Sequence, residues 1–224
     1  MRRDVRGLQL PMRIWDLPIR LFHWIIVLLI ALSYLSVRND FMRVHLVSGY
    51  AVLALLLFRV IWGFIGSDTA RFGQFLRSPL AAFRHLRHFT QRTPDIQVGH
   101  NEAGGWMVLV LLAMLAIQVG TGLCANDDGN TEGPLAKYVG KANSDWLSGL
   151  HALSFTLLLI LIGLHILAVI AYAAVRRHDL IRPMITGKKR LPAATPAPRM
   201  VPTPLALMVV IAAGLAVWLL ATRA

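Results

Sequence analysis

A long apolar run in the second half of the chain constrains the fold most. Residues Asp145–Arg176 read DWLSGLHALSFTLLLILIGLHILAVIAYAAVR and carry two histidines, His151 and His165, that are 14 residues apart. This spacing is close to four turns of helix, so both imidazoles leave the same helix face. They stand about 21 Å apart along the axis, which is most of the roughly 30 Å hydrocarbon thickness of a bilayer. Ionisable side chains at such depths are costly and usually functional, so this helix predicts a binding site near each surface.

Composition and block length predict a membrane protein. The chain has 224 residues, of which 56% are hydrophobic, and its mean hydropathy is +0.59. A soluble domain is usually about 45–50% apolar. The excess lies in blocks long enough to cross a bilayer, so we expect an all-α membrane protein with a four-helix bundle and a fifth C-terminal transmembrane helix. The expected spans are Ile19–Val37, Val44–Gly66, Gly104–Ala125, Asp145–Val175 and Leu205–Ala221.

The net charge of +12 reflects topology rather than nucleic-acid binding, because the cations lie between apolar blocks and no base-reading motif accompanies them. Seventeen Lys and Arg residues lie on the side of the N-terminus and five on the opposite side. This bias predicts a bacterial inner-membrane protein with a cytoplasmic N-terminus, a periplasmic C-terminus and an outward-facing acidic loop. A single cysteine, Cys124, excludes disulfide frameworks, cysteine-ligated zinc and iron–sulfur clusters within these residues.

The connectors suggest a domain organisation. We expect a basic cytoplasmic tail over residues 1–18, a four-helix domain over 19–187, a basic and then Pro/Ala-rich linker over 188–204, and the fifth helix over 205–222. Ser78 and Pro79 begin a short amphipathic segment that resembles a surface helix lying in the headgroups, with a solvated loop helix as the alternative. Residues 126–144 are polar and lack strand periodicity.

Four histidines sort into two pairs by depth. Given this topology, His23 matches His165 near the cytoplasmic side, and His45 matches His151 near the outer side. Haem iron takes two imidazoles from facing helices, so the pairs predict two haems, one in each leaflet. Taken singly, each histidine could be a polar interface anchor. Zinc would require a tighter cluster than the 21 Å spacing allows, about four helix turns, and carboxylates are absent from these helices.

Several segments resemble a known family. They are DLPIRLFHW, HLVSGYAVLALLLFRVIWGFIG, GHNEAGGWMVLVLL and the histidine-bearing run itself. Over about Met12–Gly187 the chain resembles the bacterial cytochrome b-561 and nickel-iron hydrogenase b-type cytochrome superfamily. The resemblance implies a four-helix core with two non-covalent b haems that passes electrons between a quinone pool and a redox partner. The partner would be a dehydrogenase, a hydrogenase or a c-type cytochrome.

Charged side chains near the histidines are candidates for contacts with haem propionates. Arg20 lies one turn before His23, and Arg59 lies 14 residues after His45 on the same helix face. We predict that both contact propionates, because Arg59 has no evident carboxylate partner; snorkelling of Arg59 to the inner surface is the alternative.

Other polar residues receive simpler interpretations. His100 and Asn101 could hydrogen-bond a quinone, although a helix cap by Asn101 is the more conservative interpretation. We expect three tryptophans to belong to interface belts rather than to contact a cofactor: Trp24, Trp62 and Trp106. Three further histidines lie among arginines, where we expect them to be solvated: His85, His88 and His178.

The sequence therefore predicts transmembrane electron transfer, with membrane lipid, quinone and a redox protein as partners and no nucleic acid. With both axial positions filled, electron transfer is favoured over chemistry at the iron. Two alternatives remain open. One is a stand-alone haem oxidoreductase acting on a small oxidant such as superoxide, and the other is a haem-free transporter or assembly protein.

Overall fold

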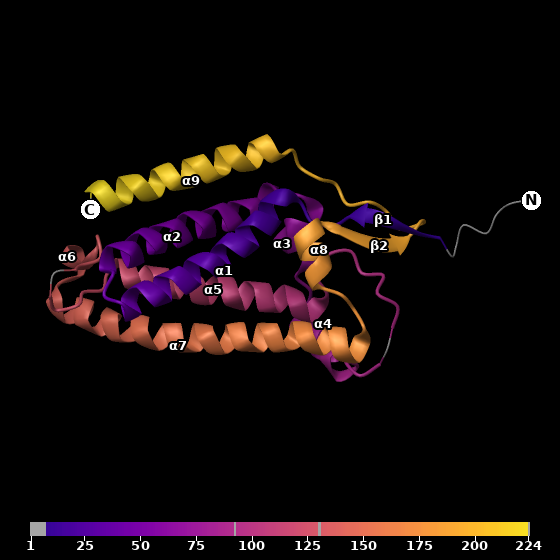
Figure 1. Ribbon diagram of the computed structural model, residues 1–224, viewed down its shortest axis with the longest axis horizontal. Helices are drawn as coiled ribbons and strands as arrows, with labels where there is room; N and C mark the ends of the chain where they lie inside the picture. Colours follow the sequence, from indigo (N-terminus) through magenta and orange to yellow (C-terminus); the bar gives the residue numbers. More distant parts are fainter. Residues whose placement is uncertain (1–7, 92, 130, 224) are drawn as a thin grey trace, which may run out of the picture.

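The computed structural model describes residues 8–91, 93–129 and 131–223, and these residues form mainly long helices (Figure 1). Residues 1–7 of the expected basic tail lie outside this description. Helices and strands follow in this order: β1 (Gln9–Arg13), α1 (Leu17–Arg38), α2 (Met42–Ile65), the turn η2 (Asp68–Ala70), α3 (Phe72–Phe75), α4 (Pro79–Arg87), α5 (Glu102–Leu123), α6 (Ala136–Val139), α7 (Lys141–Ala171), the wider turn η3 (Tyr172–Arg176), α8 (Ile181–Thr186), β2 (Lys188–Pro192) and α9 (Thr203–Arg223).

Five helices in the described part of the chain are long and apolar enough to cross a membrane, namely α1, α2, α5, α7 continued by η3, and α9. This confirms the expected membrane fold of a four-helix bundle with a fifth helix. The observed helices begin slightly earlier than expected where a cap fixes their start. Helix α1 begins after Asp16, whose side chain accepts a hydrogen bond from the Ile19 backbone N–H, and α5 begins after Asn101, which caps Gly104 in the same way.

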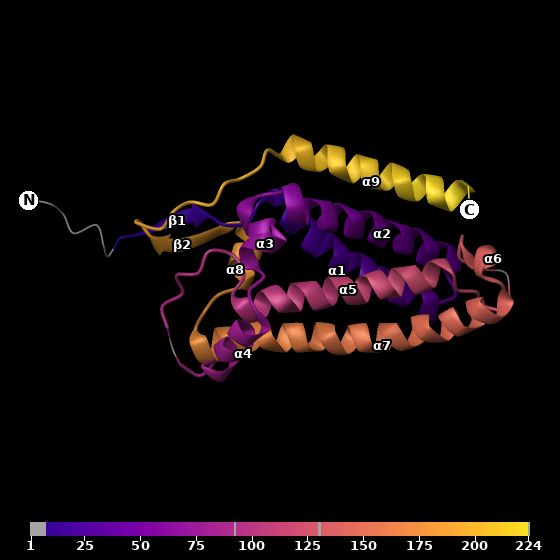
Figure 2. The same ribbon diagram turned by 180° about the vertical axis from the view of Figure 1, so that it is seen from behind.

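The bundle consists of two helix hairpins (Figures 1 and 2). Helices α1 and α2 pack along each other, and so do α5 and α7. Between the hairpins, α2 contacts α5, whereas the backbones of α1 and α7 hardly approach each other. A shared apolar core joins the four helices and includes Ile26, Val52, Leu56, Leu112 and Leu158. We call the end of the bundle that carries β1, β2, α4 and α8 the sheet end, and the opposite end, with α6 and residues 124–140, the loop end.

A two-stranded antiparallel sheet lies at the sheet end, where the sequence suggested only a tail and a linker. Strand β1 pairs with β2, so that Leu10 lies opposite Leu191 and Pro11 opposite Arg190. The paired segments are about 180 residues apart and neither shows a clear alternation of apolar and polar residues, so no local signal marks them. Leu191 is fully buried, and this burial favours the pairing.

A second apolar core lies at the sheet end beneath the sheet. It includes Ile14, Phe58, Trp62, Leu191 and Ala206, which come from β1–α1, α2, β2 and α9. The expectation that Trp62 belongs to an interface belt is therefore wrong, because its side chain is fully buried. Its indole N–H donates a hydrogen bond to the carboxylate of Asp16 at 3.0 Å, so the polar group of the ring is satisfied inside the protein.

Helix α4 begins where the sequence predicted. Ser78 caps it by accepting a hydrogen bond from the Ala81 backbone N–H at 3.3 Å. Three large apolar side chains of α4 remain exposed, namely Leu80, Phe83 and Leu86, with arginines between them. This pattern agrees with a helix lying in lipid headgroups, which stays a prediction.

Asp16 is a suitable test of how the sheet end is held together. Its buried carboxylate caps α1 and also accepts the Trp62 N–H. Asp16→Ala removes the cap and leaves a buried donor unpaired, so we expect it to destabilise the protein by about 2–4 kcal/mol. Asp16→Asn keeps one acceptor oxygen and should cost less. Thermal unfolding in detergent, followed by helical circular dichroism, would measure both; equal stability of Asp16→Ala and the unmodified protein would contradict this role.

Candidate functional site

The structure brings the four bundle histidines together as two pairs. His23 of α1 faces His165 of α7, with ring centres 6.4 Å apart. His45 of α2 faces His151 of α7, with ring centres 6.1 Å apart. Both pairs are the ones expected from depth. Helix α7 thus contributes one histidine to each pair, and the two hairpins supply opposite sides of each pair.

The separation of the rings fits a metal centre held between them. An imidazole nitrogen coordinates a transition metal at about 2 Å, and this nitrogen lies roughly 1.2 Å from the ring centre. Two imidazoles on opposite sides of one metal ion therefore place their ring centres about 6.4 Å apart. The observed distances of 6.1 and 6.4 Å are close to this value. The geometry of both pairs therefore fits axial ligation of a haem iron.

Hydrogen bonds orient both rings of the loop-end pair. Nδ1 of His45 lies 3.1 Å from the carbonyl oxygen of Ser33, and Nδ1 of His151 lies 2.8 Å from the carbonyl oxygen of Gln118. A carbonyl only accepts, so each Nδ1 carries the proton and each Nε2 keeps its lone pair. Histidines that bind metals usually show this arrangement, in which the second nitrogen donates to a fixed acceptor.

Residues of α5 also surround the loop-end pair, and sequence reasoning missed them. Gln118 places its side-chain amide nitrogen 3.1 Å from Nε2 of His151, and its side-chain oxygen accepts a 2.5 Å hydrogen bond from Ser154. A Cβ atom added at Gly122 would lie 2.8 Å from the His151 ring, so glycine leaves room for the imidazole. The only sequence signal for these residues is their position on a helix next to α7.

The sheet-end pair lies among cations and buried polar atoms without partners. Among the described residues, Nδ1 of His23 has no hydrogen-bond partner, and the same holds for one guanidinium nitrogen each of Arg20 and Arg59. Arg59 is only 3% exposed, which argues against snorkelling to the surface. Its guanidinium lies over the ring of Phe72, 4.8 Å from the ring centre, and interacts electrostatically with Asp16. Asp16 therefore lies in the surroundings of Arg59, but no ion pair joins the two side chains in the described part of the chain. An additional anionic group would satisfy these unpaired donors.

His100 lies close to this sheet-end pair. Its ring contacts Trp15 and Phe75 with ring centres 4.7 and 4.8 Å away, and its Nδ1 atom is buried without a partner. Burial, together with the nearby charge of Arg59, lowers the pKa of His100 to about 3. His100 is therefore neutral at physiological pH and offers an unused polar nitrogen beside the histidine pair. Asn101 caps α5, as the sequence suggested.

A polar cavity of about 380 Å³ lies beside His100 at the sheet end. Its walls are formed by the turn after α2, the segment that precedes α5 and the proline-containing stretch 196–198. His100 and Glu102 both line it. The cavity therefore gives access to His100, which lies close to the His23–His165 pair.

Two histidines that were expected to be solvated are part of the folded structure instead. His85 bridges Glu102 and the Tyr172 hydroxyl, and His178 is 8% exposed and lies 2.9 Å from the Thr93 carbonyl oxygen. Both lie where the long connector packs against the end of α7, a contact between distant segments that the local sequence did not indicate. His88 is exposed, as expected.

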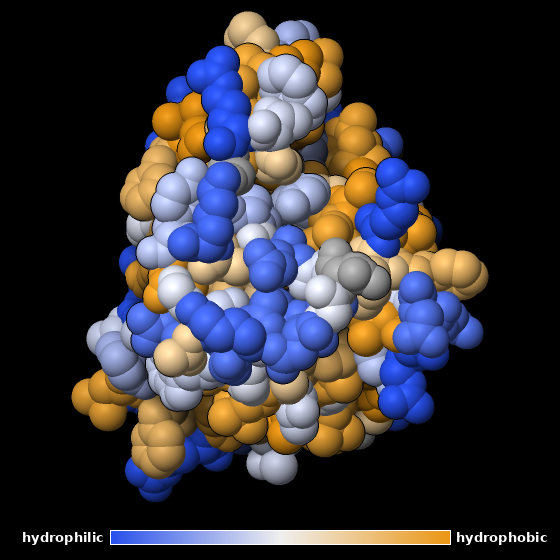
Figure 3. All heavy atoms as spheres, turned by 90° about the vertical axis from the view of Figure 1, so that its left-hand side faces the viewer, coloured by the Kyte–Doolittle hydropathy of each residue, from blue (hydrophilic) through white to orange (hydrophobic). Residues whose placement is uncertain are grey.

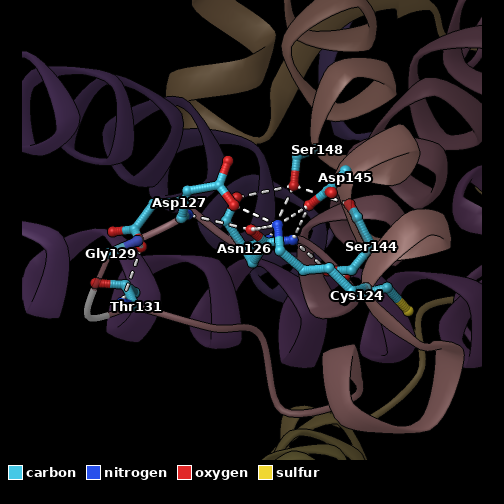
Figure 4. A network of polar contacts seen from close by, with 10 residues as sticks. Cys124, Asn126, Asp127, Gly129, Thr131, Ser144, Asp145 and Ser148 are labelled. Atoms are coloured by element: carbon cyan, nitrogen blue, oxygen red, sulfur yellow. Dashed lines mark hydrogen bonds and ion pairs between the residues drawn. The ribbon is translucent and has the colours of Figure 1, made fainter.

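The loop end carries a compact polar network near His151 (Figure 4). The Asn126 side chain donates to Ser144 and Asp145, and its backbone N–H donates to Ser148, one turn before His151. Lys141 forms ion pairs with Asp128 and Asp145. Viewed from this end, hydrophilic residues gather across the middle of the face, with hydrophobic residues around them and further hydrophilic residues at the edges (Figure 3). The network fixes the acidic loop over the end of the bundle.

Backbone hydrogen bonds also order the tip of this loop. The carboxylate of Asp127 accepts backbone N–H bonds from Thr131 and Gly129, and these bonds lower the pKa of Asp127 below its ordinary value. Asp127 therefore stays ionised at neutral pH and holds Gly129 and Thr131 by these bonds.

Comparisons with known proteins identify the family of this chain. Residues 14–187 match the family described as prokaryotic cytochrome b561. The chain is 23% identical over 211 residues to a probable Ni/Fe-hydrogenase B-type cytochrome subunit of Bradyrhizobium diazoefficiens, and the match covers 79% of this chain and 85% of that protein. No solved structure matches the chain. The family match favours the cytochrome interpretation over a haem-free transporter. This chain belongs to the prokaryotic cytochrome b561 family of multi-pass bacterial membrane proteins, b-type cytochromes that transfer electrons.

Proposed function

We propose that the protein carries electrons across the membrane through two b haems. His23 and His165 would hold one haem at the sheet end, and His45 and His151 would hold the other at the loop end. The observation that carries the proposal is the pair of ring separations, 6.4 and 6.1 Å, at two levels of one bundle. Bound haem supplies the one-electron redox couple, and the protein supplies ligands, orientation and electrostatics.

The residues around each pair support this assignment. Both imidazoles of each pair would occupy axial positions, which leaves no open position for a substrate and favours electron transfer. Arg20 and Arg59 have buried, unpaired donors near the sheet-end pair, so they suit haem propionates. The core that binds the haems would extend over residues 19–187, with 188–204 as a connecting segment to the fifth helix.

We propose that the sheet end faces the cytoplasm and the loop end the periplasm. In the sequence, seventeen of the Lys and Arg residues lie on the N-terminal side of the membrane and five on the opposite side. The chain would then place its N-terminus in the cytoplasm and its C-terminus in the periplasm, in a bacterial inner membrane.

The electron-transfer partners would be a quinone and a redox protein. His100 and Asn101, beside the sheet-end pair and the cavity, are the proposed quinone region. The relative from Bradyrhizobium is described as a subunit associated with a Ni/Fe hydrogenase, which favours a dehydrogenase or hydrogenase as the partner. A soluble redox protein that co-purifies with the chain would distinguish this role from a stand-alone reaction with a small oxidant.

The first test is the haem content. Because two histidine pairs are present, we expect two b haems per chain, measured by a pyridine haemochrome assay against protein concentration. Apoprotein refolded without haem serves as the baseline. One haem per chain, or none, would contradict the proposal.

The second test assigns the pairs. His151→Ala and His165→Ala should each remove a different haem, since the loss of one axial ligand leaves a single iron bond. His45→Ala should then give the same spectrum and redox titration as His151→Ala, and His23→Ala the same as His165→Ala. His88→Ala is the matched control on the exposed surface. The pairing would be refuted if His23→Ala and His151→Ala lost the same component.

The third test concerns Arg59. A fixed cation beside a haem favours the reduced state, so Arg59→Leu should lower the midpoint potential of the haem assigned to His23 and His165. Arg59→Lys should lie between, because lysine keeps the charge but loses the planar fork. The other haem, about 20 Å away along the helix axis, should shift much less. Potentiometric titration of the three proteins measures this, and unchanged potentials in Arg59→Leu would remove Arg59 from the haem site.

A further inference from the structure

A chain of three titratable side chains leads from the polar cavity into the protein at the sheet end. Glu102 contacts Nδ1 of His85 at 3.0 Å, and Nε2 of His85 lies 2.7 Å from the Tyr172 hydroxyl. The residues come from α5, α4 and the start of η3, so the tertiary fold alone joins them. Each contact is short enough to pass a proton directly.

Exposure falls steadily along this chain. The side chain of Glu102 is 33% exposed and lines the cavity, that of His85 is 17% exposed, and Tyr172 as a whole residue is 7% exposed. The chain therefore has one end in contact with water and one end inside. Tyr172 lies 7 residues after His165, two turns along nearly the same helix face and about 10 Å further along the axis. Its side chain also hydrogen-bonds Asn101, in the proposed quinone region.

We propose that Glu102, His85 and Tyr172 form a proton relay that serves the quinone reaction at the sheet end. This inference rests on the proposed exchange of electrons with a quinone. Reduction of a quinone to a quinol takes up two electrons and two protons, and the haems supply only electrons. The quinone reaction therefore needs a proton donor, and this chain offers a hydrogen-bonded path that begins at the cavity.

The transfer balances within the three residues. A proton moves from water at the Glu102 carboxylate to Nδ1 of His85, the Nε2 proton moves to the oxygen of Tyr172, and the hydroxyl proton of Tyr172 moves to the reduced quinone oxygen. Return of His85 to its starting tautomer completes the cycle. When a quinol is oxidised, the protons move through the same three residues in the opposite direction. Each residue recovers its initial charge, so the chain carries protons without storing them.

The charges around His85 suit this task. Burial lowers the pKa of His85 below its ordinary value; Glu102 opposes this effect, while Arg176 and His178 add to it. His85 is therefore mainly neutral at pH 7 and can both accept and donate a proton. Arg176 itself donates to the carbonyl oxygens of His88 and Phe89, which gives it a separate role in holding the connector on η3.

The experiment compares two electron donors on the full-length, haem-loaded protein. Decylubiquinol reduces haem with release of protons, whereas dithionite delivers electrons without the quinone site. Tyr172→Phe removes only the hydroxyl and keeps the ring contacts with Phe89 and His178. Glu102→Gln keeps the shape of the side chain and removes its proton exchange. In stopped-flow measurements, we expect both variants to react with decylubiquinol about tenfold or more slowly, with dithionite reduction and both midpoint potentials unchanged.

Two further measurements separate a relay from a structural role. In Glu102→Ala, added formate should restore the rate with decylubiquinol, because a small weak acid can replace the missing carboxylate; a purely structural loss would not recover. His88→Gln, on the exposed surface just after α4, is the control and should react as the unmodified protein does.

The outcomes distinguish the two levels of the proposal. If the unmodified protein is reduced by dithionite but not by decylubiquinol, the quinone reaction itself fails. If the unmodified protein reacts with decylubiquinol and Tyr172→Phe and Glu102→Gln react equally fast, the relay is overturned. The relay is also overturned if formate has no effect on Glu102→Ala or if His88→Gln is slowed to the same extent.

Discussion

The whole structure depends on placing imidazoles inside an apolar bundle. Two histidines four turns apart on α7 each face a histidine at matching depth, and polar groups at such depths in a membrane are costly and usually functional. Of the two facing histidines, one lies on α1 and one on α2, the helices of the opposite hairpin. The backbones of α1 and α7 hardly approach each other for the same reason. The two hairpins meet there through the facing histidine side chains and not through close backbone packing.

The two histidine pairs have different surroundings. At the loop end, backbone carbonyls fix both rings, and a folded polar loop covers the site. At the sheet end, the rings lie near Arg59, a neutral His100 and a cavity that opens to the surface. A rigid, hydrogen-bonded site suits electron exchange with little rearrangement, whereas a site beside a polar cavity can exchange protons as well as electrons.

The segments beyond the family match reinforce the sheet end. Strand β2 begins directly after residue 187, and the stretch that follows is held to the turn after α2. There the backbone N–H groups of Arg199 and Val201 donate to Asp68 and Ser67. Helix α9 then packs against α2, where Ala206 joins the core around Trp62. The fifth helix thus stabilises the outer face of α2 without contributing any of the four paired histidines.

Hydropathy and helical periodicity are local properties, so the sequence by itself determined the five spans, the same-face placement of His151 and His165, and the pairing of the four histidines by depth. The helix caps at Ser78 and Asn101 could be predicted in the same way, because each cap depends only on residues within the next turn. Only the tertiary structure decided the β1–β2 pairing, the burial of Trp62 against Asp16 and the position of Gln118 beside His151. The same holds for the contact of His85 with Glu102 and Tyr172, because each of these depends on which faces of distant segments meet, and nothing in the neighbouring residues specifies that.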